Sequence, residues 1–170
     1  MIRYIIIITF LIFISVSSLF ASGPKDNCFN RETKIDKFVC NALLFIKGKS
    51  LHEIRNIGKL NHEFTENKPN SHDAKIIDTF ITLQFDGLEI YGYLKSQDEL
   101  WPIRVTITKP HWKILDAIEV GVPISRISKV LGQPKEQGKN LRKYCGETDC
   151  VSFYINKGVI SKVEFYYYVD

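Results

Sequence analysis

Residues 46–57, IKGKSLHEIRNI, and residues 119–130, EVGVPISRISKV, form an internal repeat. One offset aligns Gly48 with Gly121 and also aligns the apolar residues after each glycine. These are Leu51, Ile54 and Ile57 in the first copy and Ile124, Ile127 and Val130 in the second. In both copies the apolar spacing of three residues predicts one buried stripe of a short helix.

The residues around each glycine predict a tight helix hairpin. Apolar residues recur with helical spacing over 35–46 before Gly48, and more briefly over 112–118 before Gly121. After the first glycine, Ser50-x-x-Glu53 is a capping box. After the second, Pro123 stands early in the helix, where its missing N–H costs nothing. Each copy therefore begins as helix, glycine, helix.

Strands are predicted to follow each hairpin. In the first copy they cover 77–85, 88–94 and about 101–108, with Asp86-Gly87 as the turn between the first two. In the second copy they cover 141–145, 151–155 and 159–169, with a turn at 156–158. The polar segment 61–73 is expected to be a loop, and Lys109-Pro110 is the expected boundary. We therefore expect an α+β fold of two tandem units, 23–109 and 110–170, each a helix hairpin on one face of an antiparallel sheet.

Strand alternation assigns the side chains to a covered face and an open face. The covered face is predicted to hold Ile81, Leu83, Phe85, Leu88, Ile90, Ile103, Val105, Ile107, Val151, Phe153, Ile155, Val163, Phe165 and Tyr167. The open face is predicted to hold a tyrosine-rich binding surface, which consists of Tyr91, Tyr93, Arg104, Tyr154, Tyr166 and Tyr168. Tyrosine offers a large rigid contact area and a polar tip, which suits protein binding. The alternative is that these tyrosines pack on one another or under a second layer.

The first 22 residues have the order of a secretory signal peptide. Arg3 precedes an apolar run from Tyr4 to Val16, and small residues follow at 21–23. An uncleaved membrane anchor is the alternative, because the apolar stretch is close to the minimum for crossing a bilayer. We expect cleavage and a periplasmic or secreted mature protein.

The four cysteines, Cys28, Cys40, Cys145 and Cys150, are an even number in a chain expected to be exported. Disulfides are the default in an oxidising compartment. Three pairings can be formed, and we favour Cys28–Cys40 with Cys145–Cys150, because each pair lies within one local unit. A zinc site is disfavoured by the absence of close C-x-x-C spacing.

The second copy resembles a known family. Gly121, Ile127, Val130-Leu131-Gly132 and Pro134, with the later Asn156-x-Gly158 turn, resemble the small SmpA/OmlA-type outer-membrane assembly lipoproteins. Two such units in tandem are similar to the β-lactamase inhibitor protein family. The resemblance implies a concave, tyrosine-rich binding face, and Cys28–Cys40 is similar to that family's early disulfide. Two features depart from the pattern: there is no lipobox cysteine, and Cys145–Cys150 closes a short local loop.

No pattern of catalytic residues emerges from the sequence. There is no H-E-x-x-H motif, no G-x-S-x-G elbow and no phosphate-binding glycine loop. A net charge of +4 without a Lys/Arg cluster argues against nucleic acid as a partner. We expect no enzyme activity, no metal and no cofactor. The favoured function is an exported inhibitor or immunity protein that clamps a hydrolase or toxin, and the alternative is a structural envelope-assembly module.

Overall fold

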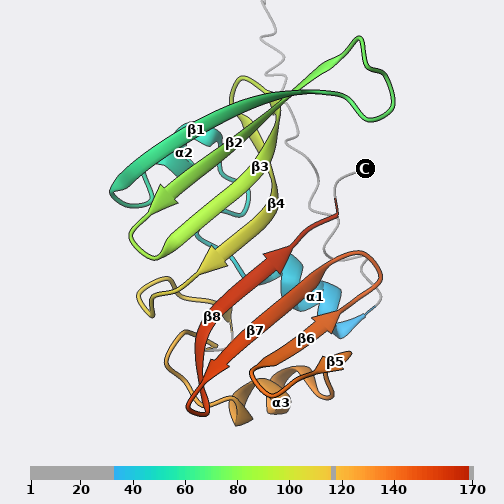
Figure 1. Cartoon of the computed structure of the whole chain (residues 1–170). Coiled ribbons are helices and arrows are strands. Elements are labelled where there is room, and N and C mark those ends of the chain that lie inside the picture. The colour runs from blue at the N-terminus through green and yellow to red at the C-terminus, as the bar shows by residue number, and fades with distance from the viewer. Residues whose placement is uncertain (1–32, 116–117, 169–170) are drawn as a thin grey trace, which may run out of the picture.

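Eight antiparallel strands form one continuous sheet, in the order β1-β2-β3-β4-β8-β7-β6-β5 (Figure 1). The computed structural model describes residues 33–115 and 118–168. The predicted signal segment and Cys28 lie outside these residues. The two halves of the sheet join where β4 pairs with β8, over Arg104–Ile107 and Val163–Tyr166.

The strands of the first half are β1 (Leu60–Pro69), β2 (Ile77–Phe85), β3 (Leu88–Ser96) and β4 (Glu99–Ile107). Those of the second half are β5 (Glu136–Gln137), β6 (Leu141–Cys145), β7 (Cys150–Asn156) and β8 (Val159–Tyr166). The predicted turns are confirmed, since Gly87 and Gly158 adopt φ of 79° and 80° between paired strands. Glycine is suited to these positions because it tolerates positive φ.

Three short helices lie on one side of the sheet: α1 (Lys34–Asn41), α2 (Leu51–Arg55) and α3 (Ser125–Leu131) (Figure 1). The predicted capping box of α2 is confirmed. The Ser50 hydroxyl accepts from Glu53 N at 3.2 Å, and Ser50 N donates to Glu53 Oε2 at 2.8 Å. At α1 the Thr33 hydroxyl accepts from Asp36 N at 3.0 Å. None of the described helices is long and apolar enough to cross a membrane.

The prediction of two tandem helix-hairpin units is wrong. The fold is mainly one eight-stranded antiparallel sheet, and the expected helix over 112–118 does not form in the described residues of that segment. Trp112 instead packs on Phe45 and Phe85 and donates its indole N–H to the Asp86 carbonyl at 2.8 Å. Three apolar residues at helical spacing are too few to sustain a helix against such tertiary contacts.

Helix α1 also argues against self-contained units. It belongs to the expected first unit, yet it packs on β6 and β7 of the second half. Phe38 of α1 stacks on Phe165 of β8, with ring centroids 6.4 Å apart. The two halves therefore share one core.

Segment 61–73 was expected to be a loop, and this prediction is also wrong. Most of it forms β1, which pairs with β2 from Leu60 to Pro69, and the turn of the β1–β2 hairpin. Every residue of β1 after Leu60 is exposed, and β1 is an edge strand of the sheet. A strand exposed on both faces has no hydrophobic alternation by which the sequence could reveal it.

The covered face forms the core, largely as alternation predicted. Most of the predicted set is buried, and Val105, Ile107, Phe153, Val163 and Phe165 are fully so. Two members are only partly buried, Ile103 and Tyr167. Tyr167 lies beyond the end of β8, where its N–H donates to the Ile103 carbonyl at 2.9 Å.

Ile103 departs from the prediction because β4 has a register shift there. Tyr91 pairs with Arg104, but the next pair is Gly92 with Pro102, so Ile103 is an extra residue in β4. Such a β-bulge reverses the alternation of the residues on its far side. Gly92 fits opposite the bulge because a Cβ at this position would lie 2.5 Å from the Trp101 carbonyl oxygen.

Candidate protein-binding face

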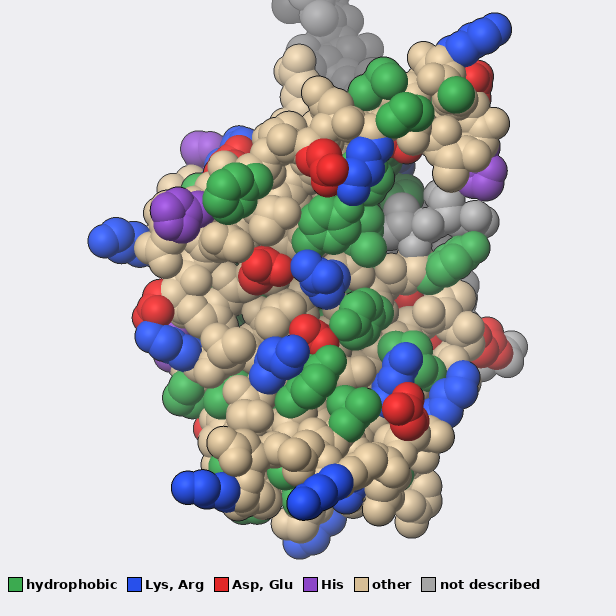
Figure 2. All heavy atoms as spheres, in the orientation of Figure 1, with side chains coloured by type: hydrophobic (Ala, Val, Ile, Leu, Met, Phe, Trp, Pro, Cys, Tyr) green, Lys and Arg blue, Asp and Glu red, His purple; other side chains and the backbone are tan. Residues whose placement is uncertain are grey.

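The face of the sheet opposite the helices, called the open face below, holds the candidate site. Figure 2 views this face, and hydrophobic and charged side chains alternate across its centre. Cross-strand pairing sets one row of side chains across nearly the whole sheet. The row runs through Phe64, Thr82, Tyr91, Arg104, Tyr166, Cys150 and Cys145.

Aromatic rings cluster on the β2–β4 part of the open face. Phe80 stacks nearly parallel on Tyr91, with centroids 5.8 Å apart and an interplanar angle of 11°. The same ring contacts Tyr93 at 5.9 Å. Tyr93 in turn pairs across the strands with Trp101. The rings therefore hold one another in place while remaining partly exposed.

Cations lie against these rings. The Arg104 guanidinium is 5.7 Å from the centroid of Tyr91, and the Lys95 ammonium is 4.2 Å from that of Trp101. Both separations are within the range of cation–π attraction. These contacts restrict side chains that would otherwise lose rotamer freedom on binding.

Glu164 organises the β7–β8 part of the open face. Its Oε2 accepts from the hydroxyls of Tyr154 at 2.5 Å and Tyr166 at 3.0 Å. Its Oε1 accepts from the Lys162 ammonium at 3.0 Å. The same ammonium lies 3.7 Å from the centroid of the Tyr154 ring. One carboxylate thus fixes two tyrosines and one lysine.

The pKa values reflect this arrangement. Burial alone would raise the pKa of Glu164, but hydrogen bonds from Tyr154, Lys162 and Tyr166 outweigh it and hold the pKa below its usual value. The hydrogen bond to Glu164 raises the pKa of Tyr154 well above that of a free tyrosine, and burial adds to the shift. Burial, followed by the hydrogen bond to Glu164, raises the pKa of Tyr166. Glu164 is therefore the ionised partner, and the tyrosines are its neutral donors.

Glu89 plays a similar part in the centre of the face. Its Oε1 accepts from Arg104 at 3.1 Å, and its Oε2 accepts from the Gln84 amide at 3.0 Å. Because Arg104 also lies over Tyr91, this network connects to the aromatic cluster.

The predicted disulfide between Cys145 and Cys150 is confirmed, with the Cα atoms 4.1 Å apart. It joins the ends of β6 and β7 at one end of the cross-sheet row, beside Tyr166. A shallow hollow of about 400 Å³ adjoins it, lined by residues that include Ser152, Tyr154 and Tyr166. Cys40 also belongs to a disulfide, and its predicted partner Cys28 lies outside the described residues.

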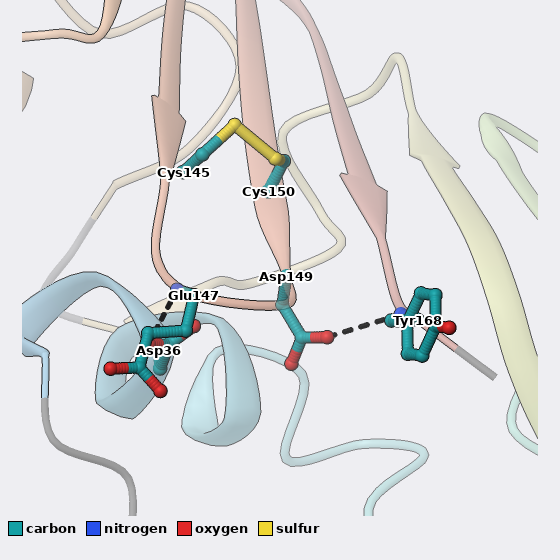
Figure 3. The surroundings of a disulfide bond; sticks show 6 residues. All are labelled: Asp36, Cys145, Glu147, Asp149, Cys150 and Tyr168. Carbon is teal, nitrogen blue, oxygen red and sulfur yellow. Dashed lines mark hydrogen bonds between the residues drawn. A yellow bond between two sulfur atoms is a disulfide. The ribbon is translucent and has the colours of Figure 1, made fainter. Parts of the chain in front are cut away.

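The loop closed by Cys145–Cys150 is anchored from the helix side by Asp36 (Figure 3). The Asp36 side chain is buried, with a residue exposure of 1%, and its Oδ2 accepts from Glu147 N at 3.0 Å and from the Thr33 hydroxyl at 2.7 Å. Burial tends to raise the pKa of Asp36. The Thr33 hydroxyl and the backbone N–H groups of residues 147, 149 and 148 outweigh burial and lower this pKa. The loop is fixed further where Asp149 Oδ1 accepts from Tyr168 N at 3.1 Å.

The structure places five of the six predicted face residues on the open face: Tyr91, Tyr93, Arg104, Tyr154 and Tyr166. Each of these tyrosines is more exposed than Phe85, Phe153 and Phe165, as predicted. Tyr168 is different, because β8 ends at Tyr166 and Tyr168 lies beyond the sheet, bonded to Asp149.

Sequence reasoning missed three aromatic residues of the open face: Phe64, Phe80 and Trp101. Phe80 was detectable, because it precedes Thr82 and Gln84 by even steps in β2. Trp101 reaches the open face because the bulge at Ile103 reverses the alternation of β4 beyond it. Phe64 lies in β1, whose polar sequence shows no hydrophobic alternation that would predict a strand.

Metal-binding chemistry has no support in the described part of the chain, which holds no group of three His, Cys, Asp or Glu side chains placed to bind an ion. Two of the histidines contact aromatic rings: His62 stacks on Phe64, and His111 contacts Trp112.

Comparison of the chain with protein-family models, with curated proteins and with solved structures finds no match. The resemblance stated above therefore contributes nothing further, and the open face has to be interpreted from its own residues.

Proposed function

We propose that this protein is an exported protein-binding module and that its open face holds a partner protein, as an inhibitor or immunity protein holds a hydrolase or toxin. The observation that carries the proposal is the Glu164 network. It fixes Tyr154 and Tyr166 in place on a side of the sheet where no described helix lies. The export element rests on the N-terminal pattern and is consistent with the Cys145–Cys150 disulfide.

The tyrosines of the open face are already ordered before a partner binds. A side chain that becomes fixed on binding costs about 0.5–1.5 kcal/mol in lost freedom. Tyr154, Tyr166 and Tyr91 are already restrained by a carboxylate and by stacked rings, so most of this cost is met when the chain folds. Residues of this kind dominate binding energy at protein interfaces.

The shape and charge of the face also favour a macromolecular partner. The aromatic cluster and the Glu164 network lie on neighbouring parts of one extended sheet, and the charges between them are paired with one another. An extended, partly apolar face with neutralised charge suits the core of a protein interface.

The test is affinity capture from envelope extract with the purified protein, followed by mass spectrometry. Tyr91→Ala and Tyr166→Ala should each lose about 2 kcal/mol or more of affinity, roughly thirtyfold, and keep a near-parental melting temperature. The control is Leu44→Ala, which removes an exposed apolar side chain away from the open face and should capture the partner normally.

A core variant separates binding from folding. Phe153 is fully buried, so Phe153→Ala should cost about 3–5 kcal/mol of stability. If the two tyrosine variants unfold in the same way, the tyrosines are structural and the proposal fails. Recovery of many partners in one large complex would instead indicate an assembly module, and binding to glycans alone would exclude a protein partner.

A further inference from the structure

Strand β1 is a long, exposed edge of the sheet. It spans ten residues, and all of them after Leu60 are exposed. One side of β1 pairs with β2, and among the described strands none pairs with its other side. The opposite edge of the sheet is β5, which has only two residues. An unpaired edge presents backbone donors and acceptors that can pair with another strand.

Strand β1 is already ordered by contacts with its neighbours before any second copy pairs with it. Arg55 of α2 donates two hydrogen bonds to the Glu63 carboxylate. Its Nε donates to Oε2 at 2.9 Å, and its Nη2 donates to Oε1 at 2.6 Å. The bidentate geometry is the strongest that an arginine and a carboxylate form. Strand β1 is therefore tied to the helix layer as well as to β2, and little order has to be gained on pairing.

The sequence of β1 is complementary to itself in antiparallel orientation. If a two-fold axis perpendicular to the sheet passes at Phe64, the two Phe64 rings face each other and His62 faces Glu66 on either side. On the other face Glu63 meets Thr65. No like charges are opposed in this register, and the facing phenylalanines cover side chains that are 55% exposed in one copy.

The neighbouring registers are poorer. An axis at Thr65 opposes His62 to Lys68 and places Phe64 against a carboxylate. An axis at Glu63 or at Glu66 opposes two identical carboxylates, which is destabilising. Moving the axis by one residue shifts the register by two residues. Only such even shifts keep the open faces of both copies on the same side, so these axes are the relevant alternatives.

We propose that two copies of this chain pair through β1, in antiparallel register about Phe64, to form one sheet from two eight-stranded halves. The cross-sheet row that ends at Phe64 in one copy then continues into the other, and the two open faces become one surface. Pairing stops at two copies because the other edge is only the two-residue β5.

The first test is a concentration series of the purified protein by analytical ultracentrifugation. The parental protein should sediment with twice the mass of Phe64→Lys, in which two ammonium groups would face each other. Phe64→Glu should be monomeric for the same reason, and an equal mixture of the two variants should recover the dimer. The control Ile77→Lys changes an equally exposed residue of β2, away from the edge, and should remain dimeric.

A second measurement tests the register. Under oxidising conditions Phe64→Cys should form a covalent dimer, whereas Thr65→Cys should not, because position 65 faces position 63 of the other copy. A parental monomer at all concentrations, or crosslinking of Thr65→Cys alone, overturns the proposal. Dimerisation needs no partner protein, and Tyr91→Ala should remain dimeric, so failure of the proposed binding function would leave this result unchanged.

Discussion

The carboxylate of Asp36 lies so close to Gly146 that a Cβ at position 146 would come within 1.9 Å of Asp36 Oδ1. These residues belong to the first helix and to the disulfide-closed loop, at opposite ends of the described chain. Their contact fixes the loop at one end of the open face and joins α1 to the C-terminal half of the sheet. The absence of a side chain at position 146 is what allows a buried carboxylate to reach the loop's backbone N–H groups.

Gly146→Ala should therefore destabilise the protein. Overpacking in a filled site costs about 1–3 kcal/mol, and here the added methyl would also displace the acceptor of the Glu147 N–H. The measurement is the free energy of unfolding in denaturant. Gly138→Ala is the control, because a Cβ there would meet nothing closer than Leu141 Cβ at 3.8 Å. Equal stability of the two variants would show that the loop yields without cost.

Asp36→Asn should lower stability at neutral pH and have less effect in acid. Hydrogen bonds to a charged group contribute about 1.5–3 kcal/mol, and the amide cannot replace the carboxylate. The pKa of Asp36 is lower in the folded chain than its ordinary value of 3.8, so the unfolded chain binds the proton first as the pH falls. The charge's contribution is thus fully present above this value and is lost as the pH falls through the folded pKa.

The measurement is unfolding of the parental protein and of Asp36→Asn from pH 7 downward, with the two stabilities expected to begin converging as the pH falls below 3.8. Glu136→Gln changes an exposed carboxylate and should follow the parental profile. A constant gap between the parental protein and Asp36→Asn at all pH values would mean that shape, rather than charge, is what position 36 supplies.

Local patterns predicted the parts of the fold that depend on neighbouring residues. The Ser50–Glu53 capping box, the turns at Gly87 and Gly158 and the Cys145–Cys150 disulfide all formed as expected. Alternation also assigned most of the two sheet faces correctly, because each strand side contacts either the core or solvent.

Features that depend on distant contacts were not predictable in this way. The bulge at Ile103 places Trp101 on the open face, and this bulge lies where β4 pairs with Gly92 of another strand. The packing of α1 on β6 and β7 rests on contacts such as Asp36 with Glu147, which no local pattern reveals. The second helix hairpin does not form, because Trp112 packs on Phe45 and Phe85 in the first half of the chain.

Glu164→Gln should lower the pKa values of Tyr154 and Tyr166. The carboxylate accepts a hydrogen bond from each phenol and repels the phenolate, so removing its charge makes both tyrosines easier to ionise. The measurement is an alkaline titration that follows phenolate absorbance. The control is Glu119→Gln, which removes a carboxylate that pairs with Lys113. An unchanged titration in Glu164→Gln would show that Glu164 does not organise the tyrosines of the open face.

The affinity for the proposed partner should depend only weakly on salt. Four ion pairs neutralise charges at the centre of the open face: Lys68–Glu66, Lys95–Glu99, Arg104–Glu89 and Lys162–Glu164. With these charges paired internally, the centre of the face offers the partner mainly aromatic surface, and burial of such surface is not screened by ions. The measurement is the dissociation constant from low salt to about 1 M, where the Debye length falls to about 3 Å.

Glu89→Gln is the matched variant for this prediction. It keeps the shape of the side chain but leaves the Arg104 guanidinium without its carboxylate, so a salt dependence should appear that the parental protein lacks. Steep weakening of the parental complex with salt would contradict the prediction. In that case the partner would be recognised through the cations of the open face, and the aromatic cluster would serve to position Arg104 and Lys95.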